Sequence, residues 1–380
     1  MNNKKVLFNT NLIYFICVVL FVVIRICAEF KLFNFLGASA GYVMSLVTQV
    51  GLIFLLPFLF FKKAHKLKTK ETFKAFNFRK ISFKAVVISV VIGVIVFFLN
   101  VYVSNFFNNI IAKLGYNHVP STSKYSGEVW ALFLNLFCTA VLPAFAEESL
   151  HRGMLLTGNS SLGMKKSILI SGLLFGLFHL NIEQTFYAIV IGLFLGYVCW
   201  GSNSIYPCMI IHFMNNALSV FLSFARARGW SIGYMFTYIS EFLSKNATLG
   251  ALMFVLAVII LIVVLFELTK ALIKDTFETG IKKRQKEFAN MAIRESYFQQ
   301  ISDIKKGEIV PEDNKNVIYV DMKDFMNFVD MNFDAIMKSV EENERKAKVQ
   351  KIEKRTKIML FGSFALTTIV TIMTFIWGLL

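Results

Sequence analysis

The chain has 380 residues, of which 56% are hydrophobic and 15% aromatic, and its mean hydropathy is +0.60. Its apolar residues form long blocks, and several blocks reach the roughly 20 residues that a helix needs to cross a bilayer core. The formal net charge of +16 comes from Lys and Arg gathered in the loops between blocks, where they set membrane orientation, so a nucleic-acid partner is not expected. The composition indicates a polytopic helical membrane protein, and the absence of a Gly-rich phosphate loop argues against nucleotide-driven functions.

Nine apolar segments are predicted to span the membrane. In chain order they are residues 12–28, 35–61, 85–107, 129–156, 167–180, 185–200, 206–224, 249–268 and 358–380. Pro143 predicts a tilt or kink in the fourth span, because proline lacks the backbone N–H and clashes with the preceding turn. The fifth and sixth segments are short, which favours a broken or partly re-entrant path there.

Basic residues predict the orientation of the chain. The connector 62–84 carries nine Lys or Arg residues against the single acid Glu71, and Lys4 and Lys5 precede the first span. Both regions are therefore expected on the cytoplasmic side. Within the connector, residues 72–80 alternate aromatic and cationic side chains, as in a segment that lies on anionic headgroups or in an ordinary positive-inside loop.

A polar region separates the last two predicted spans. Residues 270–357 mix both charge signs, and 324–354 has the apolar spacing of an amphipathic helix. We therefore predict an all-α, polytopic transmembrane helical bundle of about nine spans, with a cytoplasmic helical insertion before the last span. Its predicted divisions are a two-span region with the basic connector (1–81), a membrane core (82–269), the cytoplasmic region (270–357) and a final transmembrane helix (358–380).

The fourth span contains charged residues, which are energetically unfavourable inside a membrane. Each charge inside a membrane segment costs roughly 2.5 to 3.5 kcal/mol on insertion scales. At helical spacing Glu148 and Arg152 stand at i and i+4, as do Glu147 and His151, so all four fall on one face. That face predicts a buried active site.

Two further spans carry polar groups of the same kind. His179 follows Phe175 at the end of the fifth span, and His212 and Asn216 stand at i and i+4 on the seventh. Any one of them alone could serve only to bond a backbone carbonyl or to join helices. Together they bring catalysis-capable groups from three helices into an apolar interior, where desolvation and like charge displace carboxyl protonation equilibria. A glutamate could take a proton from a water, and a histidine or the asparagine could stabilise the oxyanion formed on attack at a carbonyl.

These three motifs together resemble a known family. They are Glu147-Glu148-x-x-x-Arg152, Phe175-x-x-x-His179 and His212-x-x-x-Asn216. In this order and separation, over residues 82–224, the chain resembles the CPBP family of intramembrane proteases, also called the Abi or type II CAAX prenyl endopeptidase family.

The resemblance implies a role for each motif. Glu147 would activate the water, supported by Glu148 and Arg152, and His179 would be its partner in that step. The third motif would form the oxyanion site, whereas the family pattern does not require His151, so its role stays open. The implied substrate is a membrane-embedded or membrane-associated protein or peptide. The Lys- and Asn-rich composition, and not the resemblance, favours a bacterial plasma membrane.

The metal content is left open by the resemblance, since the family is described both as metalloprotease and as metal-independent glutamate protease. If a metal such as zinc is present, Glu147, His179 and His212 are the candidate ligands, because three protein ligands plus a water are the usual catalytic pattern. We favour a metal-free site. In straight, centred spans Glu147 and His179 would lie in opposite halves of the membrane, so the mechanism requires the kink and the short fifth span to bring them level.

Two other functions are compatible with parts of this pattern. The same fold could act as a non-catalytic membrane scaffold or bacteriocin-immunity protein that binds and shields a partner. A proton-coupled transporter could use Glu147 and Glu148 as relay groups, but this would leave the Arg, His and Asn residues unexplained.

Overall fold

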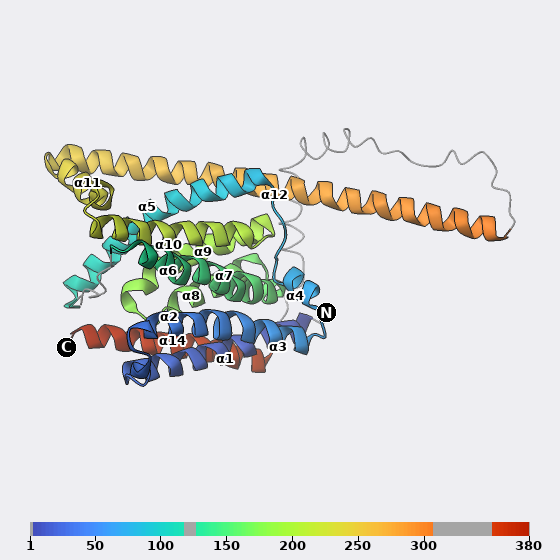
Figure 1. Ribbon diagram of the computed structural model, residues 1–380, viewed down its shortest axis with the longest axis horizontal. Coiled ribbons are helices and arrows are strands. Elements are labelled where there is room, and N and C mark those ends of the chain that lie inside the picture. The colour runs from blue at the N-terminus through green and yellow to red at the C-terminus, as the bar shows by residue number, and fades with distance from the viewer. Residues whose placement is uncertain (1–2, 118–126, 307–351, 380) are drawn as a thin grey trace. The chain divides into compact units, whose positions relative to one another are not determined.

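The computed structural model describes residues 3–117, 127–306 and 352–379. Within these ranges every regular element is a helix, and eight helices are long and apolar enough to cross a membrane. They are Asn3–Glu29, Ala40–Ala64, Phe83–Lys113, Val129–Leu156, Ile182–Ser202, Tyr206–Ala227, Ala247–Gly280 and Lys354–Leu379. Both the all-α class and the polytopic helical bundle are confirmed, and the chain is an integral membrane protein (Figure 1).

The difference between eight spans and the expected nine lies in the fifth segment. Here the chain forms α8 (Met164–Leu177), a helix of 14 residues. At 1.5 Å per residue it is about 21 Å long, which is shorter than a bilayer core of about 30 Å. After a short turn, α9 (Ile182–Ser202) returns alongside it. His179 lies in this turn, just beyond the end of α8.

The fourth span is one continuous helix with wide, π-helical turns. Its parts are α6 (Val129–Leu136), η3 (Phe137–Val141), α7 (Leu142–Glu148) and η4 (Ser149–Leu156). Pro143 is the second residue of α7 and has no N–H to donate to the carbonyl of Thr139. Asn216 of α10 (Tyr206–Ala227) donates to that carbonyl from Nδ2 at 3.0 Å. A side chain from another helix thus occupies the acceptor that the proline cannot use.

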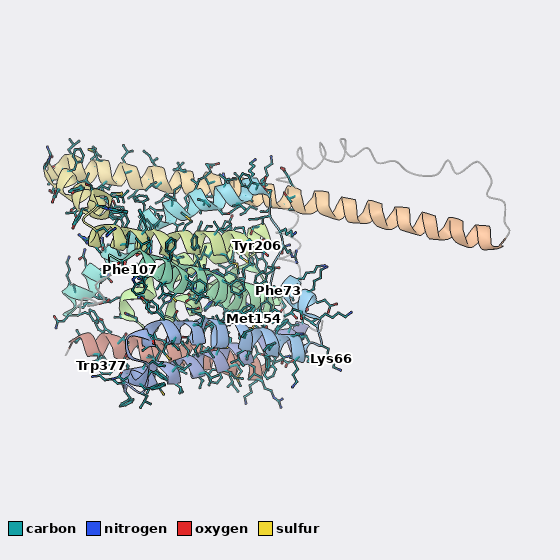
Figure 2. All side chains as sticks on the ribbon, in the orientation of Figure 1. Lys66, Phe73, Phe107, Met154, Tyr206 and Trp377 are labelled. Atoms are coloured by element: carbon teal, nitrogen blue, oxygen red, sulfur yellow. The ribbon has the colours of Figure 1, made fainter. Side chains whose placement is uncertain are left out.

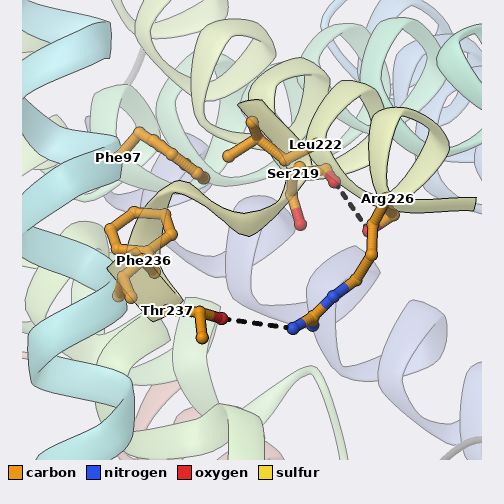
Figure 3. Close-up of a pocket in the computed structure, with 9 residues that line it drawn as sticks. Phe97, Ser219, Leu222, Arg226, Phe236 and Thr237 are labelled. Carbon is orange, nitrogen blue, oxygen red and sulfur yellow. Dashed lines mark hydrogen bonds between the residues drawn. The ribbon is translucent and has the colours of Figure 1, made fainter. Parts of the chain in front are cut away.

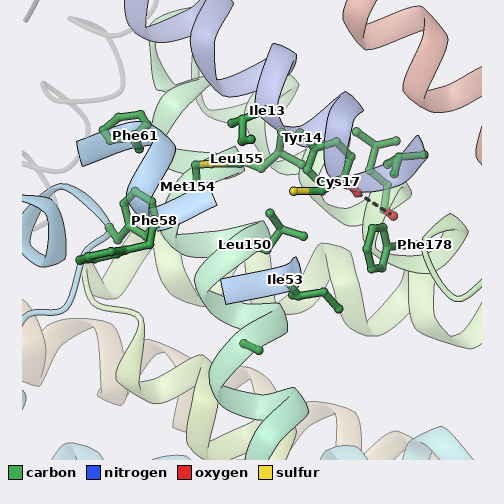
Figure 4. Packing of buried hydrophobic residues seen from close by; sticks show 14 of the residues in the cluster. Ile13, Tyr14, Cys17, Ile53, Phe58, Phe61, Leu150, Met154, Leu155 and Phe178 are labelled. Carbon is green, nitrogen blue, oxygen red and sulfur yellow. Dashed lines mark hydrogen bonds between the residues drawn. The ribbon is translucent and has the colours of Figure 1, made fainter. Parts of the chain in front are cut away.

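The core beside the fourth span is built from the first two spans and α8. The helix α1 (Asn3–Glu29) contributes Tyr14 and Cys17, and the wide-turn segment η2 (Val47–Leu55) of the second span contributes Ile53. They pack with Leu150 of the fourth span and with Phe178, which follows α8 (Figure 4). The first and second spans therefore form part of the surroundings of the charged face.

The aromatic residues of the connector belong to this core as well. The short helix α4 (Thr69–Ala75) ends before Phe76, whose ring lies 5.7 Å from Phe58 and 5.3 Å from Phe61 of α3 (Leu56–Ala64). Phe76 is only 1% exposed, and Phe73 lies 4.7 Å from Phe58 (Figure 2). These rings therefore pack on other aromatic side chains of the protein.

Contacts divide the chain into two compact units, residues Met1–Thr276 with Gln350–Leu380, and residues Phe277–Val349. In the first unit α14 (Lys354–Leu379) packs along α1. Two backbone N–H groups bind its far end: Asn117 donates to the carbonyl of Gly378 at 2.7 Å, and Ile182 donates to Oγ1 of Thr374 at 3.1 Å. The last span is therefore an integral part of the first unit.

The helix α12 (Ala247–Lys306) includes residues of both units. In the first unit its apolar side chains are mostly exposed, as expected for a helix that faces lipid, and the large apolar side chains that it buries are Leu272 and Ile273. The amphipathic helix predicted at 324–354 lies almost entirely outside the described residues. The four functional divisions of the chain stay a prediction.

Glycines let α8 and α9 approach closely. An added Cβ at Gly176 would lie 2.7 Å from the backbone N of Ile189 and 2.7 Å from the carbonyl O of Thr185. Gly192 of α9 makes the reciprocal approach, because a Cβ there would lie 2.7 Å from the carbonyl O of Gly172. Small residues of this kind allow membrane helices to touch backbone to backbone.

We expect Gly176→Ala to lower the thermal unfolding midpoint in detergent, because overpacking against backbone atoms costs about 1 to 3 kcal/mol. The matched control is Gly41→Ala in α2 (Ala40–Leu46), where an added Cβ meets nothing within 4 Å. That variant should unfold at an unchanged or slightly higher temperature. Equal midpoints for the two variants would contradict the close packing of α8 on α9.

Candidate active site

A buried ion pair lies at the centre of the charged face. Arg152 donates from Nη1 to Oε1 of Glu148 at 2.8 Å, and both side chains are fully buried. The arginine also donates from Nη2 to the carbonyl of Gly192 at 3.0 Å, and its guanidinium carbon lies 4.3 Å from the centre of the Phe175 ring. Because a buried charge needs a partner and further hydrogen bonds, this environment explains how an arginine is retained here.

His212 of α10 joins this ion pair. Its Nδ1 donates to the same Oε1 of Glu148 at 2.8 Å, and the imidazole is nearly buried. Glu148 thus receives two hydrogen bonds at one oxygen, while its Oε2 is buried without a partner in the structure. The carboxylate of Glu148 is therefore committed to orienting Arg152 and His212.

The ring of Phe175 brings the predicted residues together. The centre of the ring lies 5.3 Å from that of His179, 5.7 Å from that of His212 and 5.1 Å from that of His151. All three imidazoles stand nearly perpendicular to the ring. The three motifs, although far apart in the sequence, therefore gather around one aromatic side chain of α8.

His179 is held so that one nitrogen is left for chemistry. Its Nδ1 lies 3.0 Å from the carbonyl oxygen of Phe175, and since a carbonyl only accepts, Nδ1 donates. A neutral imidazole with its hydrogen on Nδ1 carries a lone pair on Nε2. The side chain is half-buried. His179 can thus accept a proton at Nε2.

Glu147 has a different environment from its neighbour Glu148. It is half-buried, and its Oε1 accepts a hydrogen bond from Nε2 of Gln49 at 2.8 Å. Gln49 lies in the second span, 98 residues earlier in the chain, and the sequence analysis did not identify it. The available signal was a lone glutamine inside an apolar span.

His151 has a bonding role, since both of its ring nitrogens are engaged. Its Nδ1 donates to the backbone carbonyl of Glu147 at 2.9 Å, and its Nε2 lies 3.2 Å from the hydroxyl of Tyr14. That hydroxyl also lies 3.3 Å from the carbonyl of Leu174. His151 is fully buried and links α1 to the turn of the helix that carries Glu147.

The side chain of Asn216 in α10 makes two hydrogen bonds, one to the fourth span and one within α10. Besides its bond to Thr139, its Oδ1 accepts a hydrogen bond from Nδ2 of Asn215 at 3.0 Å. Within the described ranges no hydrogen bond joins it to the other motif residues. Its proposed place in an oxyanion site therefore rests on its position one turn from His212.

The candidate zinc ligands do not form a metal-type cluster. In the part of the chain that the structure describes, no group of three or more His, Cys, Asp or Glu side chains is arranged so that it could hold a metal ion. Glu147, His179 and His212 are all described, and Nδ1 of His212 is already bonded to Glu148. The three residues do not fit the usual three-ligand zinc site in this arrangement.

A pocket of about 270 Å³ opens at the other end of α10. It is lined by Phe97, Ser219, Leu222, Arg226 and Phe236, among others, and Arg226 donates to Thr237 at 3.4 Å (Figure 3). Arg226 lies 14 residues from His212, or about 21 Å along a helix. The pocket contains none of the predicted site residues.

Comparison with known proteins supports the motif analysis. The family model described as type II CAAX prenyl endopeptidase Rce1-like matches residues 129–218. This segment contains all three motifs, so the predicted resemblance is confirmed there. No curated protein and no solved structure matches the chain. Gln49, Tyr14 and α14 lie outside the matched segment.

We expect Arg152→Ala to lower the free energy of unfolding by about 3 to 5 kcal/mol, because the buried carboxylate of Glu148 would lose its compensating charge. Thermal unfolding in detergent measures the change. The control is Lys270→Ala, which removes a 3.1 Å pair with Glu267 in which both side chains are more than half exposed. Such pairs contribute about 0 to 1 kcal/mol, so similar shifts for the two variants would contradict a stabilising buried pair.

Proposed function

We propose that this CAAX-protease-like membrane protein is an intramembrane endopeptidase that activates a water with Glu147 and His179. The observation that carries the proposal is the gathering of His179, His212 and the Glu148–Arg152 ion pair around Phe175. The backbone carbonyl of Glu147 is bonded to His151, whose ring lies against the same Phe175. Three helices meet there, and the family model matches the segment that contains them.

The proposed reaction begins with a water beside Glu147. The carboxylate of Glu147 takes one proton as the water oxygen attacks the carbonyl carbon of the scissile peptide bond, and the second proton stays on the new hydroxyl group. The proton on Glu147 then passes, directly or through Nε2 of His179, to the nitrogen of the leaving amine as the C–N bond breaks, which leaves a carboxylic acid and an amine. Glu147 and His179 are therefore assigned the acid–base steps.

The developing oxyanion is assigned to His212. In its imidazolium form His212 carries a hydrogen on both nitrogens, so it can donate to Glu148 through Nδ1 and to the oxyanion through Nε2. Asn216, one turn further along α10, retains one N–H beyond its bond to Thr139. Glu148, paired with Arg152, holds the imidazole of His212 in position. No step is assigned to a metal, because the three candidate ligands do not form a metal-type group.

The proposed substrate is a membrane-embedded or membrane-associated protein or peptide, since the site lies among transmembrane helices. The basic connector supports a cytoplasmic placement for itself and for the N-terminal end of α1. The membrane is proposed to be a bacterial plasma membrane.

We expect Glu147→Gln to lower kcat by about 10²- to 10⁴-fold, the usual contribution of a general base. His179→Ala should fall in the same range. The full chain in lipid nanodiscs would be incubated with a pool of transmembrane and membrane-anchored peptides, and the products identified by mass spectrometry.

The matched controls are Glu267→Gln and His65→Ala, which lie outside the site and should cleave at the rate of the wild type. Thermal unfolding checks that each variant is folded. Full activity in folded Glu147→Gln protein would reject the endopeptidase. A cellular phenotype that survived this substitution would instead favour a non-catalytic scaffold.

A further inference from the structure

Gln49 is the residue whose side chain holds the carboxylate of Glu147. Its Nε2 lies 2.8 Å from Oε1, and among the residues that the structure describes it is the one donor to that carboxylate. The orientation of the amide follows from chemistry, because its oxygen would repel a carboxylate whereas its NH2 group donates to it.

Gln49 is hydrogen-bonded through its amide donor and not through its amide acceptor. Its own Oε1 is buried and has no hydrogen-bond partner in the structure. In the structure the side chain is therefore paired through its donor alone.

Neighbouring contacts fix the position of Gln49. One turn earlier, Ser45 donates to the carbonyl of Cys138 at 3.1 Å, and two turns earlier Tyr42 donates to Oδ1 of Asn135 at 3.4 Å. These bonds join the second and fourth spans along their length. Gln49 continues this line of contacts and is the member of it that reaches a proposed catalytic group.

We propose that Gln49 is a positioning residue of the active site, which fixes the Glu147 carboxylate through Oε1 and leaves Oε2 directed to the attacking water. The inference rests on the proposed function and extends the site beyond the segment matched by the family model. A neutral amide suits this task, since a Lys or Arg would form an ion pair with the carboxylate and weaken it as a base. The second span is thereby part of the catalytic apparatus.

The first experiment tests the contact without using activity. Thermal unfolding midpoints are measured for the wild type, Gln49→Leu, Glu147→Ala and the double variant, all as full chains in detergent. If the two side chains interact, the shift of the double variant is smaller than the sum of the two single shifts. Additive shifts would overturn the contact, whether or not the protein cleaves any peptide.

The second experiment tests the role in catalysis. We expect Gln49→Leu, which has a similar volume and no donor, to lower kcat by about 10- to 100-fold with KM changed less than twofold, because a misplaced catalytic group can cost about 10²-fold. The control Thr48→Val removes a hydroxyl that donates to the carbonyl of Met44 within the same helix, and it should retain the wild-type kcat.

A background variant separates positioning from general damage. In Glu147→Gln protein the carboxylate is gone, so adding Gln49→Leu should change the residual rate less than twofold. A fall of the same factor in both backgrounds would overturn the positioning role. If the wild type cleaves nothing, the proposed function fails, while the unfolding cycle still decides the contact.

Discussion

The rest of the bundle depends on the buried ion pair of Glu148 and Arg152. Glu148 and Arg152 are fully buried, so their charges must be compensated by protein groups alone. The compensation comes from three other elements: a carbonyl of α9, a ring of α8 and an imidazole of α10. The carbonyl, Gly192 O, belongs to a residue packed against α8 through paired glycines. The glycine contacts and the ion pair thus depend on each other, and together they place the histidines.

The adjacent carboxylates of Glu147 and Glu148 lie in different environments. Glu148 receives two charge-assisted bonds and no solvent, which suits a fixed counter-ion. Glu147 is half-buried and accepts one bond from a neutral amide, so it keeps an oxygen for a small molecule. The backbone of Glu147 is itself held, through His151 and Tyr14, by α1. One turn of helix therefore carries a structural acid and a chemically available acid side by side.

The sequence allowed the local parts of this arrangement to be predicted, and the distant parts not. Apolar length identified the spans, and i, i+4 spacing identified the Glu148–Arg152 pair, because both depend on a single helix. The contacts of Gln49 with Glu147 and of Tyr14 with His151 join residues 98 and 137 positions apart, and are set by helix packing that no local pattern encodes. Asn216 was recognised as a polar site residue, but its bond to the carbonyl left by Pro143 depends equally on two helices meeting. The short α8 was visible as a short apolar segment, whereas the helix that its glycines contact, α9, was not.

The packing of α14 along α1 has a consequence for how the protein is made. The ribosome delivers α14 only after the whole of residues 277–349 has been synthesised. Yet α14 bonds to Ile182, the first residue of α9, and to Asn117, four residues after the end of α5 (Phe83–Lys113). During this interval the face of α1 that later contacts α14 is therefore not yet covered by it. Assembly of the first unit is consequently a late event of biogenesis, completed when the two helices furthest apart along the polypeptide meet.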